Sequence, residues 1–227
     1  MRCVTAGLKT LIALSLVLGS SALAGAPRVL VTAFDPFAGA PYNASQEMVQ
    51  AFRDSLAQLP LAVPAEVQVE ILPVVYGEAE ERLFQLIASF QPDAVVSFGQ
   101  AGPGGFLLEQ VARNWDGGYP DNLGKSRTGE IVKGGPKTLK TSLPVTPIFQ
   151  AFRKAGIPVG MSTDAGDFLC NHLFYQLMTV APRSNLKRAG FIHVPDFGPG
   201  YASNPRGWGV KYAPAIRHAV TETLIGL

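Results

Sequence analysis

The chain has 227 residues and a formal net charge of only +2, with 19 Lys and Arg against 17 Asp and Glu. No run of basic residues forms a stripe, which makes nucleic acid and anionic lipid poor candidates as partners. Hydrophobic residues make up 47% of the chain, a share that argues against disorder and suits a domain with a sizeable core.

The first 24 residues have the pattern of a cleavable export signal. Arg2 and Lys9 supply positive charge, residues 11–18 form a short apolar run, and Ala22-Leu23-Ala24 is a small-x-small cleavage site. A spanning helix needs about 20 apolar residues, so the alternative of an uncleaved anchor fits less well. We therefore predict a signal peptide at 1–24, one domain at 25–227, and a periplasmic or secreted location with no membrane attachment after cleavage.

Short apolar runs alternate with amphipathic stretches through the first half of the domain. Strands are predicted at residues 28–34, 67–75 and 94–98, and helices at 43–58 and 78–90. From residue 99 to 136 the pattern dissolves into Gly, Pro and Asp, apart from an apolar island at 106–112. This predicts a long loop, which in a compact domain is usually functional or disordered.

The second half continues the alternation. Helices are predicted at 146–155 and from Cys170 to about residue 179, and strands at 159–162 and 189–194, the latter stopped by Pro195. A last helix is predicted to begin near Pro214. This order predicts a single α/β domain with a mostly parallel, twisted sheet and helices on both faces. In such sheets functional groups gather at the carboxyl ends of the strands.

Cys170 is the only cysteine of the predicted mature domain, because Cys3 lies in the signal. An exported protein with one thiol cannot form an intramolecular disulfide, so Cys170 is free, buried or reactive. It stands where a loop turns into a helix, and a helix N-terminus favours a thiolate. A small buried hydrophobe is the alternative. The polar neighbours Asp164, Asp167 and Asn171 favour a nucleophile.

A cysteine nucleophile needs a base, and the chain has three histidines. His172 follows Cys170 by two residues on the same helix and points to a different side, so it cannot easily reach the sulfur. His218 lies in the terminal amphipathic helix, where a solvated or partly packed histidine is expected. His193 ends a buried strand at the rim where α/β sites form, which makes it our predicted base. A satisfied core histidine is the alternative there.

The acid that orients the base is left open between Glu109 and Asp121. Glu109 lies in the apolar island, where a carboxylate is costly unless it is paired. Asp116, Asp164 and Asp196 are expected to be turn or surface acids. Phe34 and Phe37 flank a loop after the first strand, which suggests a binding pocket, although such rings often fold back into the core.

Six segments together resemble the pyroglutamyl peptidase I family of cysteine peptidases. They are Phe34-Asp35-Pro36-Phe37, Gly99-Gln100-Ala101-Gly102, Pro120-Asp121-Asn122, Ser142-Leu143-Pro144, residues 165–171 around Cys170, and residues 190–195 around His193. The resemblance implies a central mixed sheet and a triad of Cys170, His193 and Glu109, with Asp121 as a secondary candidate for the acid. It also implies that Phe34, Phe37, Phe168 and Gln100 bind a pyroglutamyl ring.

The resemblance further implies removal of N-terminal pyroglutamate from small peptides through a thioester acyl-enzyme, with no metal or cofactor. It makes a homodimer or homotetramer a candidate assembly, and a cytoplasmic location the alternative to export. Members of the family commonly carry an arginine after the Gly-Gln-Ala-Gly segment, whereas residues 103–106 here have none. Two alternatives therefore stay open: a cysteine amidase for another cyclic acyl group, and a non-catalytic protein that binds pyroglutamyl peptides.

Overall fold

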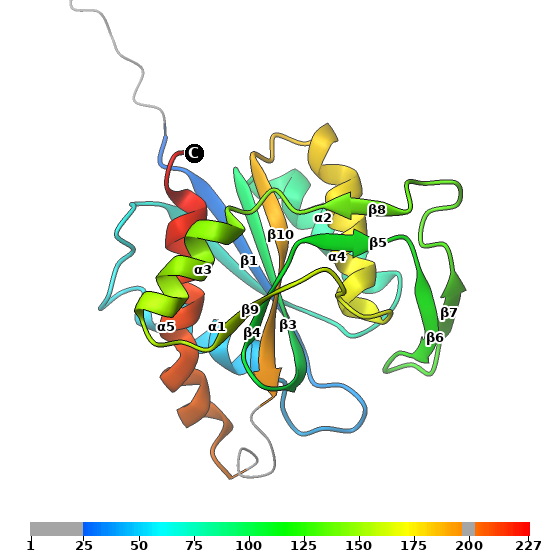
Figure 1. Cartoon of the computed structure of the whole chain (residues 1–227), viewed down its shortest axis with the longest axis horizontal. Helices are drawn as coiled ribbons and strands as arrows, with labels where there is room; N and C mark the ends of the chain where they lie inside the picture. The colour runs from blue at the N-terminus through cyan, green and yellow to red at the C-terminus, as the bar shows by residue number, and fades with distance from the viewer. Residues whose placement is uncertain (1–24, 197–202) are drawn as a thin grey trace, which may run out of the picture.

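The computed structural model describes residues 25–196 and 203–227, so the predicted signal peptide lies outside the described residues. A six-stranded sheet has the order β2-β1-β3-β10-β4-β9 (Figure 1). Its strands are β1 (Arg28–Phe34), β2 (Glu66–Leu72), β3 (Ala94–Pro103), β4 (Phe106–Glu109), β9 (Val159–Ser162) and β10 (Arg188–Asp196). The first four strands in that order are parallel, whereas β4 pairs antiparallel with β10 and parallel with β9. The predicted mixed, mostly parallel sheet in one α/β domain is confirmed.

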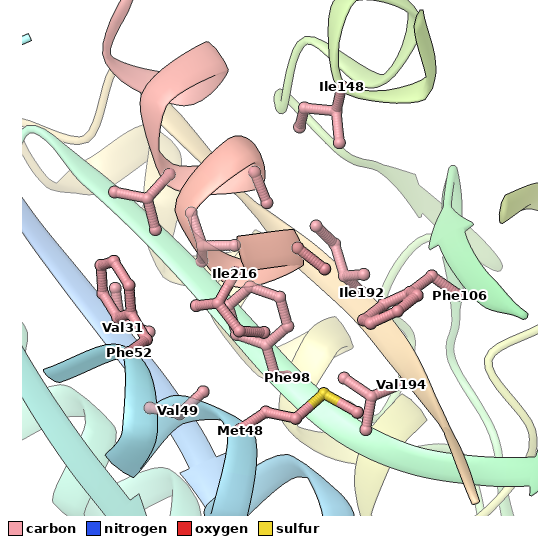
Figure 2. Close-up of a cluster of buried hydrophobic side chains, with 14 of the residues drawn as sticks. Val31, Met48, Val49, Phe52, Phe98, Phe106, Ile148, Ile192, Val194 and Ile216 are labelled. Atoms are coloured by element: carbon pink, nitrogen blue, oxygen red, sulfur yellow. The ribbon is translucent and has the colours of Figure 1, made fainter. Parts of the chain in front are cut away.

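Helices cover both faces of this sheet (Figure 1). They are α1 (Ala44–Ser55), α2 (Glu78–Phe90), α3 (Val145–Lys154), α4 (Leu169–Val180) and α5 (Pro205–Leu224), with a short 3-10 helix, η1 (Ala181–Arg183), after α4. On one face α1, α3 and α5 bury apolar side chains such as Phe52 and Ile216, which Figure 2 shows around Phe98. On the other face α2 and α4 bury Leu83 and Leu173 in a second apolar core. Helices α1, α2 and α3 are each held by one apolar face, whereas α4 is buried over most of its length.

The predicted long loop at 99–136 is wrong. These residues hold the end of β3, all of β4, and the short strands β5 (Val111–Arg113), β6 (Asp116–Pro120) and β7 (Ser126–Gly129). Strand β5 pairs with β8 (Thr138–Lys140), while β6 and β7 form an antiparallel hairpin. Three to five residues are too few to show an alternating pattern, and the glycines at 118 and 129 adopt positive φ.

Two predicted boundaries at prolines are also wrong. Strand β10 continues through Pro195 to Asp196, at an irregularity in its pairing with β3 and beyond the last residue paired with β4, so no ladder donor is needed there. Helix α5 begins at Pro205, not near Pro214, because Pro205 suits the first helical position and the Asn204 side chain accepts from the Gly207 amide. Pro214 lies inside this helix, beside the buried Ala213 and Ala215.

Within the described part of the chain, none of the helices has the length and apolarity to cross a bilayer.

The first core predicts a test of stability. Phe98 is fully buried between β3 and the helices of that face. We expect Phe98→Ala to lower the free energy of unfolding by about 3–5 kcal/mol in urea titrations, because it removes a large apolar side chain and leaves a cavity. Lys154→Ala, at an exposed position of α3, should change it by less than about 0.5 kcal/mol. Similar losses in the two variants would contradict this account of the core.

Candidate active site

Cys170 is the second residue of α4, as the sequence predicted, and its thiol is free and partly buried. The N-cap is Phe168, which is extended and makes no side-chain hydrogen bond to the helix. The first amide groups of an α-helix have no acceptor within the helix, and the helix dipole gives that end a positive potential. The start of α4 therefore offers free N–H groups beside a thiol.

Strand β3 approaches the sulfur closely at Gly99. A Cβ at this position would lie 2.8 Å from Cys170 Sγ and 2.6 Å from Cζ of Phe191. Gly99 pairs in register with His193 of the neighbouring strand β10. Glycine at 99 therefore leaves the space in which the thiol approaches Phe191 and His193 of β10.

Glu109 reaches His193 because β4 runs antiparallel to β10. Glu109 is paired with Phe191 in the ladder, and residues 191 and 193 face the same side of β10. The Glu109 Oε1 atom lies 2.8 Å from Nδ1 of His193. Glu109 is fully buried, and its other oxygen has no hydrogen-bond partner among the described residues. The imidazole is thus the carboxylate's one polar contact within that part of the chain.

The imidazole of His193 keeps a proton well above neutral pH. Burial lowers its pKa, but the negative charge of the Cys170 thiolate, the hydrogen bond between the two groups and the Glu109 carboxylate raise that pKa to about 10. With Nδ1 engaged by Glu109, Nε2 is the nitrogen left for the sulfur. Thiol, imidazole and carboxylate form one row from α4 through β10 to β4.

A small cavity opens beside the thiol. It is lined by Phe34, Phe37, Asn43, Val74, Gln100, Phe168, Leu169 and Cys170. The rings of Phe37 and Phe168 lie 6.3 Å apart. Gln100 accepts a hydrogen bond from the Ala44 amide through Oε1, which fixes the orientation of its side-chain amide. All four residues predicted to bind substrate, Phe34, Phe37, Gln100 and Phe168, line this one cavity.

Asp121 is held in a different place. Its carboxylate accepts hydrogen bonds from the amides of Tyr76, Leu123 and Lys125, at 3.0, 2.8 and 2.9 Å. Burial raises the pKa of Asp121, but these backbone donors outweigh it and lower that pKa overall. The carboxylate fixes the turn after β6, and Glu109 is the acid that contacts His193.

The other two histidines contact other side chains. His218 lies on α5 with its ring 6.5 Å from that of Phe152. His172 is fully buried, with Nδ1 2.9 Å from Asp116 Oδ2 and Nε2 3.0 Å from Glu80 Oε1. The expectation that Asp116 is a turn or surface acid is therefore wrong, because it lies in β6 with its side chain turned into the interior. Sequence spacing could not have predicted this group of His172, Asp116 and Glu80, because the three residues come from three separate elements.

Among residues 25–196 and 203–227, no group of three or more His, Cys, Asp or Glu side chains is placed to hold a metal ion. A thiol beside an imidazole that is oriented by a buried carboxylate is the arrangement of cysteine hydrolases.

Comparisons with known proteins give the family. A model of the pyroglutamyl peptidase family matches residues 27–214. Pyrrolidone-carboxylate peptidase 1 of Ralstonia nicotianae is 39% identical over 173 residues, which cover 74% of this chain and 78% of the relative. The pyrrolidone-carboxylate peptidase of Bacillus velezensis is 39% identical over 172 residues, with the same coverage.

Solved structures of pyroglutamyl peptidases are also similar to this chain. The pyroglutamyl peptidase I of Bacillus amyloliquefaciens aligns with a TM-score of 0.75 and 31% identity, over 87% of this chain and 97% of its own. A mutant pyrrolidone carboxyl peptidase of Pyrococcus furiosus aligns with a TM-score of 0.77 and 28% identity, over 88% and 99%. The chain belongs to the pyroglutamyl peptidase family, and it is a cysteine peptidase by that membership.

The contact at Gly99 predicts a test that needs no substrate. We expect Gly99→Ala to displace the Cys170 sulfur and to slow its alkylation by iodoacetamide, while the protein stays folded by circular dichroism. Gly102→Ala is the matched control, because a Cβ at 102 of the same strand has no atom of the described residues within 4 Å. Equal alkylation rates in the two variants would show that β3 does not position the thiol.

Proposed function

We propose that this chain hydrolyses the bond after an N-terminal pyroglutamyl residue, with Cys170 as nucleophile, His193 as acid and base, and Glu109 as the acid that orients the base. The observation that carries the proposal is the row of these three side chains, of which Cys170 lines an aromatic cavity. Family membership supports the substrate class.

In the first half of the reaction the Cys170 thiolate attacks the carbonyl carbon that joins pyroglutamate to the next residue. The carbonyl π electrons move onto oxygen, and the free amides at the start of α4 donate hydrogen bonds to it. In acyl-transfer enzymes each such donor is worth about 3 kcal/mol. His193 then gives its proton to the leaving nitrogen, the C–N bond breaks, and a thioester remains on Cys170.

In the second half His193, now neutral, takes a proton from a water molecule. The resulting hydroxide attacks the thioester carbon, the C–S bond breaks, and pyroglutamate leaves with the thiolate restored. Glu109 accepts from Nδ1 throughout, which holds the ring and stabilises its protonated form. The proton that His193 takes from water replaces the one that it gave to the leaving nitrogen, so the thiolate and the protonated imidazole are both restored.

The lining of the cavity suits a pyroglutamyl ring. Apart from the thiol itself, its lining side chains are aromatic, aliphatic or amide, and none of them carries a charge. A free N-terminal ammonium would lose water there with no carboxylate to pair with it, which is costly. An uncharged lactam can lie against the rings of Phe37 and Phe168 and accept a hydrogen bond from the side-chain amide of Gln100, whose Oε1 is held by Ala44.

We also propose that residues 1–24 direct export of the enzyme. The charged start, short apolar run and small-x-small site support this proposal, and the family match begins at residue 27.

The nucleophile is tested by hydrolysis of a fluorogenic pyroglutamyl amide under reducing conditions. We expect the mature protein to cleave it, and Cys170→Ala and Cys170→Ser to lose roughly 10⁴-fold or more in kcat/KM. Cleavage of another cyclic acyl amide, with none of the pyroglutamyl compound, would favour the amidase alternative. Binding without cleavage by a wild type whose thiol is inert would favour a binding protein.

The role of Glu109 is tested by the pH dependence of kcat/KM. The wild-type value should fall as His193 loses its proton near pH 10, since the leaving amine then lacks its acid. Glu109→Gln removes a charge that raises the pKa of His193, so the alkaline limb should move to lower pH. Asp121→Asn, which changes an acid without a contact to His193, should leave the limb in place. A limb moved by Asp121→Asn and not by Glu109→Gln would reverse the assignment.

A further inference from the structure

The two residues after Cys170 tie the first turn of α4 to the connection between β5 and β6. Asn171 is fully buried; its Oδ1 accepts from the Arg113 amide at 2.8 Å, and its Nδ2 donates to the Arg113 and Trp115 carbonyls, both at 2.9 Å. On the other side of Cys170, the Gly117 amide donates to the Asp167 carbonyl at 2.7 Å. Residues 113–117, which we call the cradle segment, therefore hold the turn from both ends.

His172 adds an ionic tie to the same segment. Its Nδ1 contacts Asp116 in the cradle segment, and its Nε2 contacts Glu80 of α2, both within 3.0 Å. Carboxylates only accept, so both ring nitrogens must donate, and an imidazole with two N–H groups is an imidazolium. Burial lowers the pKa of His172, but the hydrogen bonds and charges of Asp116 and Glu80 raise it overall.

The surroundings of His172 balance its charge. Glu80 faces it from α2 and Asp116 from β6, and Arg127 of β7 lies 3.5 Å from Asp116 Oδ2. The ring of Tyr76 meets the imidazolium edge-on at 5.2 Å. Two carboxylates, one imidazolium and one guanidinium thus share a region in which Glu80, Asp116 and His172 are all buried. Without His172, two buried carboxylates would face one half-exposed arginine.

We propose that His172 is a positioning residue for the peptidase reaction, a buried imidazolium that ties the first turn of α4 to β6 and α2. It thereby sets where the Cys170 sulfur and the free amides of that turn lie relative to His193. This inference rests on the proposed function. His172 itself touches no reacting atom, since it has no exposed surface and both its nitrogens are engaged.

A contact at the first turn of α4 should affect the reaction differently from a contact farther along the helix. Tyr175, which follows about one turn later, is also fully buried and donates to the Pro136 carbonyl at 2.7 Å. It holds the same helix without bonding the cradle segment. A misplacement of about 1 Å at the reacting atoms can cost roughly 100-fold in rate, so a shift of the first turn should affect chemistry more than a loosened Tyr175.

The test compares His172→Gln with Tyr175→Phe in the mature protein. We expect both to lower Tm, but only His172→Gln to lower kcat for the pyroglutamyl amide, by about 10- to 100-fold and by more than KM changes. Alkylation of Cys170 by iodoacetamide should slow in His172→Gln and stay at the wild-type rate in Tyr175→Phe. Wild-type kcat and alkylation in a folded His172→Gln variant would overturn the proposal.

Glu80→Gln keeps the pair of His172 with Asp116 and removes one charge, so it serves if His172→Gln does not fold. It should lower kcat by a smaller factor than the one expected for His172→Gln. A wild-type kcat in this variant would then overturn the proposal. If the wild type cleaves no pyroglutamyl amide, the proposed function fails. In that case the alkylation rates of the same variants, which need no substrate, still test whether His172 positions the Cys170 sulfur.

Discussion

A carboxylate without exposed surface must have a partner, and Glu109 has His193. Burying an unpaired carboxylate costs several kcal/mol, so this contact constrains everything that carries either group. Strand β4 has to lie antiparallel beside β10, with Glu109 opposite Phe191, for the oxygen to reach Nδ1. Because Nδ1 of His193 is bound to Glu109, Nε2 is the nitrogen that faces Cys170 on α4. The one reversal in an otherwise parallel run of strands therefore places Glu109, the acid of the proposed triad, beside His193.

At the candidate site the sequence departs from the usual residue preference at a helix N-cap. Phe168 is a poor N-cap, because it offers no oxygen to the free amides of α4. The same ring lines the cavity beside the thiol, and the uncapped amides stay available to a developing negative charge. A serine or aspartate at 168 would satisfy those amides and remove a wall of the cavity. Such departures from local preference are expected at functional sites.

The sequence predicted the parts of this molecule that depend on local pattern. Cys170 at a helix start and His193 on a buried strand follow from apolar runs, and the fold class follows from their alternation; the end of that strand was placed too early, at Pro195. The choice between Glu109 and Asp121 did not follow from spacing, because the pairing of β4 with β10 joins residues 84 apart. His172 with Asp116 and Glu80 was missed for the same reason. The strands between residues 99 and 136 were missed because they are short, and α5 was begun too late because Pro214 was given more weight than Asn204 and Pro205.

The strand order has a consequence for when the enzyme becomes active. Strand β10 is the last strand in the sequence, yet it occupies the middle of the sheet between β3 and β4. A growing chain can pair β1, β2 and β3 early, but the centre stays open until residues 188–196 have been made. Cys170 is therefore synthesised before His193, and Glu109 cannot contact His193 until β10 has paired with β4. In nascent and unfolded chains Cys170, the proposed nucleophile, therefore lacks its contacts with the proposed base and acid, and we expect no hydrolysis until β10 has entered the sheet.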